Sequence, residues 1–179
     1  MRAGAAIGAT ITAAFLALGG GPWAGSPAGD PGVRGSAQVT DVVDGDTIVV
    51  ALGSGTETVR LLGIDTPEKP GGPRPAECGG TAASERTAQL VPPGTAVTLE
   101  RDQDSRDQYG RVLAYVTRTS DQLFVNEALI AEGHATASFY EPNTTWRTQF
   151  RRAELLAQRD NRGFWGACGG PEVLLDPDA

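Results

Sequence analysis

The chain has 179 residues, of which 40% are hydrophobic and 21% are charged. This length and composition suit one globular domain and exclude a fibrous or wholly disordered protein. The formal net charge of -7 excludes a generalised phosphate-binding surface, because non-specific affinity for nucleic acids comes mainly from many Lys and Arg contacts. Any chemistry on a nucleic acid must therefore be concentrated at a local site.

The N-terminus has the pattern of a signal peptide. Arg2 precedes an apolar run over residues 5–18, which is shorter than the roughly 20 residues that a membrane span needs. We expect cleavage after Ala24 or Ala28, which makes 1–28 the signal peptide, 29–36 a flexible linker and the mature protein secreted without stable membrane association. An uncleaved anchor or a disordered tail is the alternative.

Five segments rich in Val, Ile, Leu and Thr have the alternation of strands. They span residues 38–43, 47–52, 57–63, 96–101 and 111–116. Asp44-Gly45 separates the first pair and Gly53-Ser54-Gly55 the second, and such turn residues are typical of an antiparallel meander.

Helical periodicity predicts helices over residues 81–90, 126–132 and 145–159. The second is closed by Gly133, and the third is preceded by the capping residues Asn143 and Thr144. In the third helix Trp146, Phe150, Ala153, Leu156 and Ala157 fall on one face, which is most simply core packing.

The order of these elements indicates an α+β domain, mainly β, over residues 37–170, followed by a tail at 171–179. A five-stranded OB-fold Greek-key barrel with three flanking helices is the economical architecture. Another α+β sandwich would also fit the order of elements.

Two cysteines, Cys78 and Cys168, lie in Gly-flanked segments. Export would place them where disulfides persist, so we expect a bond that ties the loop before the first helix to the tail after the last. A zinc site is the weaker alternative, since structural zinc usually takes four Cys or His ligands and the chain has a single His, His134.

Acidic turns follow two of the predicted strands. Asp44 and Asp46 flank Gly45, and Asp65 and Glu68 follow the third strand. Calcium prefers oxygen ligands from carboxylates and carbonyls, so turns that converge at adjacent strand ends predict a calcium site. Each motif alone is also consistent with an ordinary turn.

Arg60 and Arg111 interrupt or begin apolar strand segments. A charge buried there is costly unless a partner or ligand satisfies it, and two guanidinium groups facing a bound cation would clamp a phosphodiester. The alternative is that each arginine lies at a strand end and pairs with a local carboxylate such as Asp107.

Four segments together resemble the staphylococcal nuclease (thermonuclease) family, in the family's order and at similar spacing. They are VDGDT at 43–47, VRLLGIDTPE at 59–68, DQYGRVLAY at 107–115 and VNEAL at 125–129. The resemblance covers residues 38–165 and implies a monomeric, calcium-dependent endonuclease that cuts DNA and RNA, preferably single-stranded, and leaves 3′-phosphate ends.

The resemblance also assigns roles to individual residues. It implies that Asp46, Asp65 and the carbonyl of Thr66 are calcium ligands and that Glu68 is the general base. It also implies that Arg60 and Arg111 bind the phosphate and that Tyr109 and Tyr140 line the nucleotide pocket. His134 is not expected to be catalytic.

The chain departs from the family pattern at Gln108 and Ser138, where the best-known member has a lysine and a tyrosine, and its loop 69–76 is less basic. These departures predict weaker substrate binding with the catalytic groups intact. Two rivals remain open: a non-catalytic OB-fold module that binds nucleic acid, and a calcium-stabilised structural domain.

Overall fold

The computed structural model describes residues 34–175. The predicted signal peptide and the predicted linker up to residue 33 lie outside the described residues. In chain order the elements are β1 (Arg34–Val42), β2 (Thr47–Leu52), β3 (Gly55–Leu61), β4 (Ile64–Asp65), α1 (Gly80–Leu90), β5 (Ala96–Glu100), β6 (Val112–Arg118), β7 (Leu123–Phe124), α2 (Val125–Ala131), β8 (Thr136–Ala137), α3 (Arg147–Arg159) and α4 (Phe164–Ala167).

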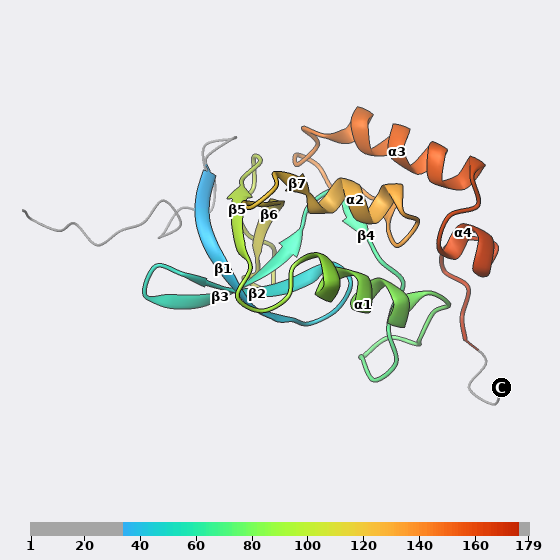
Figure 1. Cartoon of the computed structure of the whole chain (residues 1–179), viewed down its shortest axis with the longest axis horizontal. Helices are drawn as coiled ribbons and strands as arrows, with labels where there is room; N and C mark the ends of the chain where they lie inside the picture. Colours follow the sequence, from blue (N-terminus) through green and yellow to red (C-terminus); the bar gives the residue numbers. More distant parts are fainter. Residues whose placement is uncertain (1–33, 176–179) are drawn as a thin grey trace, which may run out of the picture.

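The strands form a closed barrel, as the sequence predicts. The sheet runs β3-β2-β1-β5-β6-β7, and a parallel pairing between β3 and β6 closes it. In that pairing Arg60 lies opposite Leu113. Figure 1 shows β1, β2, β3, β5 and β6 of the barrel toward one end of the molecule and most of the helices toward the other. A closed five-stranded barrel with this order confirms the OB-fold.

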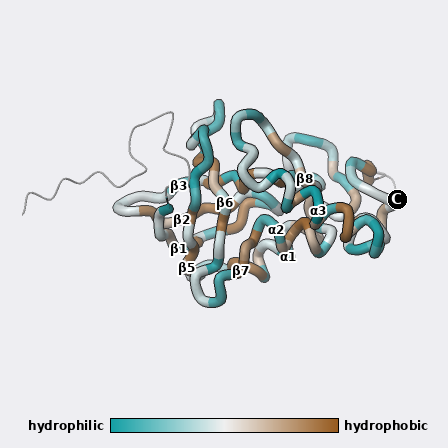
Figure 2. The backbone as a smooth tube through the Cα atoms, turned by 90° about the horizontal axis from the view of Figure 1, so that it is seen from above, coloured by the Kyte–Doolittle hydropathy of each residue, from teal (hydrophilic) through white to brown (hydrophobic). Residues whose placement is uncertain are grey.

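The core fills the barrel and continues beneath the helices. Ile48 and Val50 of β2, Val59 of β3 and Leu99 of β5 are completely buried, because alternate residues of each strand point inward. Burying one such side chain contributes roughly 1.5–3 kcal/mol. Along the tube of Figure 2, hydrophobic stretches recur in the strands and helices, while the peripheral loops are mostly hydrophilic.

Helix α2 packs against both α1 and α3. Phe150, Ala153 and Ala157 of α3 are buried as the sequence predicts, whereas Leu156 is 38% exposed. The buried Glu154 of α3 accepts a hydrogen bond from the backbone N–H of Ala137 at 3.0 Å. Helix α4 was not expected. It is a single turn between Gly163 and Cys168, too short to show a helical period.

Asn126, at the start of α2, bonds to β6 and to the residue that follows β3. It is completely buried. Its side-chain oxygen accepts the N–H of Val116 at 2.8 Å, and its amide donates to the carbonyl of Leu62 at 2.8 Å. The helical end is therefore tied to the barrel by hydrogen bonds as well as by apolar packing.

Backbone pairing reaches past residues 37–170 at both ends. Strand β1 begins at Arg34, and Arg34 to Ser36, which the composition assigns to a linker, pair with β5. At the other end Leu174, in the expected tail, forms an antiparallel bridge with Glu77. Backbone pairing with a distant strand orders these segments, and their composition cannot reveal it.

A disulfide joins Cys78 to Cys168, 90 residues apart in the sequence. It ties the segment before α1 to the residue that follows α4. Within residues 34–175, no helix is long and apolar enough to cross a membrane.

Candidate active site

The site begins at the tight turn between β1 and β2. The N–H of Asp46 donates to the carboxylate of Asp44 at 3.2 Å, and the buried Thr87 of α1 donates its hydroxyl to the carbonyl of Gly45 at 2.6 Å. A Cβ added to Gly45 would lie 2.6 Å from Oγ1 of Thr66. Only glycine lets this turn approach Thr66 so closely.

Arg60 lies between two carboxylates. Its Nη2 atom is 3.0 Å from Oδ2 of Asp46 and 2.9 Å from Oδ1 of Asp65. Its Nη1 atom donates to the carbonyls of Leu61 and Ile64 at 2.8 and 2.9 Å. These contacts give the arginine in this apolar strand two carboxylate partners, and they hold the guanidinium in one orientation.

Thr66 completes this group. Its N–H and its hydroxyl both donate to Oδ2 of Asp46, each at 3.3 Å, while the hydroxyl of Thr47 donates to Oδ1 at 2.9 Å. Strand β4 pairs with β8, with Asp65 opposite Thr136. The two acidic turns that the sequence singles out therefore meet at one place.

The carboxylates crowd one another. Burial raises the pKa of the Asp65 carboxyl above its ordinary value; the Arg60 guanidinium lowers that pKa, and the Asp46 carboxylate raises it. Burial and the neighbouring Asp46 likewise raise the pKa of Asp44. A bound cation would relieve this repulsion.

Glu68 lies at the base of loop 69–76. Its carboxylate forms an ion pair with Arg74 of that loop. Its backbone is bonded to Glu77, whose Oε2 accepts the N–H of Glu68 at 3.0 Å. The charges of Arg74 and Glu77 act on the Asp65 carboxyl, so the Glu68 group and the Asp46–Arg60–Asp65 group are electrostatic neighbours.

Arg111 pairs locally. Its Nε atom donates to Oδ2 of Asp107 at 2.7 Å, and its backbone N–H donates to Oδ1 at 2.9 Å. Its guanidinium lies 5.6 Å from the ring centre of Tyr109. The sequence left open whether Arg111 clamps a phosphate or pairs with Asp107. Without substrate, Arg111 pairs with Asp107.

Arg111 nevertheless belongs to the same region of the barrel as Arg60. The parallel register sets Leu113 opposite Arg60, and residues two apart on an extended chain share a face. The predicted pocket residues Tyr109 and Tyr140 are 75% and 76% exposed, and no contact joins Tyr140 to the carboxylates in the described part of the chain. Tyr109 therefore lies beside a phosphate-binding candidate.

The donor set fits a calcium ion. Two carboxylate oxygens already face one positive charge, that of Arg60, and calcium takes carboxylate, carbonyl and water oxygens together. Within residues 34–175, no group of three or more His, Cys, Asp or Glu side chains is placed to hold a metal. Calcium at this site would therefore need backbone and water oxygens besides Asp46 and Asp65.

Comparison with known proteins decides the family. The family described as staphylococcal nuclease homologue matches residues 58–167. The chain belongs to the staphylococcal nuclease family. It is 40% identical over 134 residues to the thermonuclease of Staphylococcus intermedius, which covers 74% of this chain and 78% of that protein. It is also 40% identical over 152 residues to endonuclease YncB of Bacillus subtilis (strain 168), which covers 79% of this chain and 69% of the relative.

Two contacts of Glu68, with Arg74 and with Glu77, were not predicted from the sequence. Arg74 and Glu77 lie six and nine residues after it, with a Pro- and Gly-rich loop between. No periodic spacing links residues across such a loop, so the sequence carries no signal for these contacts. Ser138, at one of the departures from the family pattern, donates its N–H to the carbonyl of Gly63 at 3.0 Å, and this backbone bond does not depend on the side chain.

Proposed function

We propose that this protein is a secreted, calcium-dependent endonuclease that hydrolyses phosphodiester bonds of DNA and RNA and leaves 3′-phosphate ends. The observation that carries the proposal is the meeting of Asp46, Arg60 and Asp65 within hydrogen-bond distance, beside Glu68, in a member of the staphylococcal nuclease family. The names of its relatives, thermonuclease and endonuclease, support the same reaction.

Asp46, Asp65 and the carbonyl of Thr66 would hold the calcium ion. When bound, the ion supplies positive charge that polarises a phosphate oxygen. Arg60 is held by the carbonyls of Leu61 and Ile64 through Nη1 and by the carboxylates of Asp46 and Asp65 through Nη2. Its Nε–H is the donor left for the phosphate, and its fixed positive charge stabilises the extra negative charge of the transition state.

Glu68 is the proposed general base. Its carboxylate orients the attacking water and takes its proton. Since Arg74 pairs with this carboxylate in the protein alone, the water must enter beside Arg74 or displace it.

Arg111 is the second proposed phosphate ligand. Its Nε is occupied by Asp107, which leaves its Nη atoms to a phosphate oxygen, and Tyr109 beside it offers an exposed ring for a base. Base stacking on aromatic rings is tolerant of sequence, and a splayed single strand exposes such bases best. We therefore expect single-stranded substrates to be preferred. We also expect the protein to act as a monomer.

Export is proposed from the leader at 1–28 and from the disulfide between Cys78 and Cys168, since disulfides persist in oxidising compartments. With a net charge of -7, the substrate is held mainly by the site itself. Binding should therefore be weak and lose affinity further as salt rises.

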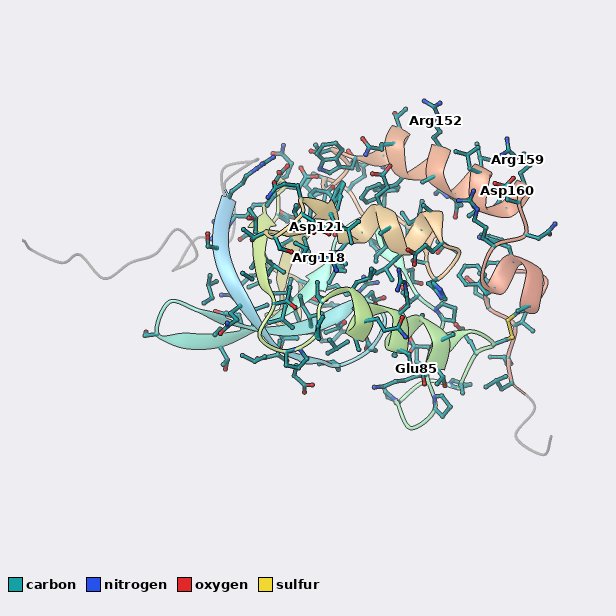
Figure 3. The ribbon with its side chains drawn as sticks, viewed as in Figure 1. Glu85, Arg118, Asp121, Arg152, Arg159 and Asp160 are labelled. Atoms are coloured by element: carbon teal, nitrogen blue, oxygen red, sulfur yellow. A yellow bond between two sulfur atoms is a disulfide. The ribbon has the colours of Figure 1, made fainter. Side chains whose placement is uncertain are left out.

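The test is cleavage of denatured DNA and of RNA by protein lacking residues 1–28, with calcium and with chelator, beside Glu68→Ser and Arg60→Ala. Glu85→Ala, an exposed change on α1 (Figure 3), is the control. We expect calcium-dependent cutting that is lost in both site variants and kept in the control, with product ends that a 3′-phosphatase can dephosphorylate. If the wild type binds calcium and cuts neither polymer, the non-catalytic binding module is the better account.

A further inference from the structure

We propose that Glu77 is a positioning residue that holds Glu68 in its catalytic orientation. This inference rests on the proposed role of Glu68 as the base. Two hydrogen bonds join the residues: Oε2 of Glu77 accepts the N–H of Glu68 at 3.0 Å, and the N–H of Glu77 donates to the carbonyl of Glu68 at 2.8 Å. They are nine residues apart, so the pair closes loop 69–76 at its base.

Gly80, the first residue of α1, packs closely against the backbone of Glu68. A Cβ added to Gly80 would lie 2.1 Å from the carbonyl oxygen of Glu68, so the two backbones are already in close contact. The N–H of Gly80 also donates to the carbonyl of Glu77 at 3.1 Å. Both the N–H and the carbonyl of Glu68 are thus bound, and the contacts come from the Glu77–Gly80 segment.

Glu77 is itself anchored from the far end of the chain. Residues 173–175, the C-terminal strap, run antiparallel to residues 76–78, with Leu174 opposite Glu77. The N–H of Cys78 donates to the carbonyl of Val173 at 2.7 Å, and the N–H of Leu175 donates to the carbonyl of Ala76 at 2.9 Å. The disulfide from Cys78 to Cys168 lies next to this pairing.

This arrangement ties the backbone of Glu68 to the Glu77–Gly80 segment, while its carboxylate pairs with Arg74 of loop 69–76. Residues 71–75 are exposed and contain two Gly and two Pro, whereas Glu77 is attached to the strap, to α1 and, through Cys78, to the disulfide. A displacement of about 1 Å at a catalytic group can cost about 100-fold in rate. The side-chain acceptor of Glu77 therefore serves to fix the backbone from which the Glu68 carboxylate extends.

The experiment compares Glu77→Ala, Glu77→Gln and Glu77→Asp with the wild type, with Glu85→Ala as the matched loss of an exposed carboxylate. In steady-state cleavage of denatured DNA with calcium, we expect Glu77→Ala to lower kcat about 10- to 100-fold, the range found for residues that orient catalytic groups, with KM within about twofold. Glu77→Gln keeps an oxygen acceptor at the same reach and should recover most of kcat. Glu77→Asp, one methylene shorter, should not.

Equal losses in the Ala and Gln variants, an unchanged kcat in the Ala variant, or a change confined to KM would overturn the proposal. Amide hydrogen exchange gives a readout that needs no activity: the Glu68 N–H should exchange faster in Glu77→Ala than in Glu77→Gln. Unchanged protection in the Ala variant would refute the positioning role. A wild type without nuclease activity would instead refute the proposed function, and the exchange comparison would still decide the role of Glu77. Should the Ala variant fail to fold, the Gln and Asp variants decide it.

Discussion

The guanidinium of Arg60 lies 3.0 Å from the carboxylate of Asp46, although the two residues come from different strands and turns. The side chain of Arg60 is only 15% exposed and that of Asp46 10%. A buried pair of this kind is costly to break from one side, because the remaining charge is left uncompensated. The pair is therefore a sensitive place to probe both stability and activity.

Arg60→Lys tests the geometry of that pair. A single ammonium keeps the charge but cannot reach both carboxylates and the carbonyls of Leu61 and Ile64 from one planar fork. We expect kcat/KM on denatured DNA to fall about 100- to 1000-fold, as for loss of a transition-state donor. Arg159→Lys, on the outer surface of α3 (Figure 3), is the control. A lysine variant with wild-type activity would mean that only the charge of Arg60 matters.

Gly45→Ala tests the close approach of the acidic turn to Thr66. The added Cβ would meet the Thr66 side chain at 2.6–2.9 Å, and overpacking of this kind costs about 1–3 kcal/mol. We expect a lower free energy of unfolding in urea and a weaker calcium affinity by calorimetry. Gly55→Ala, where nothing lies within 4 Å of the added atom, should change neither. Unaltered calcium affinity in Gly45→Ala would show that the close approach of this turn to Thr66 is not required for calcium binding.

Asn126→Leu should destabilise the fold without touching the site. It leaves the N–H of Val116 and the carbonyl of Leu62 without their partner in a dry interior, at about 1–3 kcal/mol for each orphaned group. Urea denaturation followed by tryptophan fluorescence measures the change. Gln158→Leu, an exposed position on α3, should stay close to the wild type. A loss of less than about 1 kcal/mol at Asn126 would show that the helical end is held by apolar packing alone.

The pattern of residues predicted the barrel because each strand buries alternate side chains, and that alternation is local. It also placed acidic turns at adjacent strand ends, where Asp46 and Asp65 meet around Arg60. For both Arg60 and Arg111 it left open whether the guanidinium pairs with a nearby carboxylate or clamps a phosphate. A carboxylate four residues away in the sequence and a phosphate brought by substrate satisfy the same guanidinium.

Neither Glu77 nor the start of β1 was predictable in this way. The contacts of Glu77 join residues on opposite sides of a loop and reach the C-terminal strap. Arg34 to Ser36 become strand only because β5 offers them a partner. Pairings of this kind are set by the finished fold and leave no period in the sequence.

Reduction of the disulfide should lower stability. In the chain-entropy account, closing a loop of 90 residues stabilises the folded state by roughly 4–5 kcal/mol, with measured values typically 2–4. We expect thermal unfolding at a clearly lower Tm for Cys78→Ser/Cys168→Ser and for reduced wild type, by similar amounts. Reductant should leave the Tm of the double variant unchanged. A Tm of the reduced wild type equal to that of the oxidised protein would contradict the prediction.

His134 should make stability depend on pH below neutrality. Burial lowers the pKa of its imidazole below 6.5; Glu132 opposes the shift and Arg86 adds to it. Below pH 6.5 the His134 imidazole therefore binds a proton more readily in the unfolded state than in the folded state. The stability contributed by neutral His134 is complete above pH 6.5 and is lost as the pH falls through the folded pKa. The free energy of unfolding of His134→Gln should fall less steeply than that of the wild type as pH drops below 6.5. Parallel curves would assign the pH dependence to other groups.

The C-terminal strap also has a consequence for the order of synthesis. Cys168 follows Cys78 by 90 residues, and the strap follows Cys168, so the ribosome delivers the strap that pairs with Glu77 more than 90 residues after Glu77 itself. The carboxylates of Asp46 and Asp65, the guanidinium of Arg60 and the proposed base Glu68 are all synthesised much earlier. A chain that stops before residue 173 thus carries every proposed catalytic group without the strap that anchors Glu77, and its phosphodiesterase activity should remain low until residues 173–175 have been added.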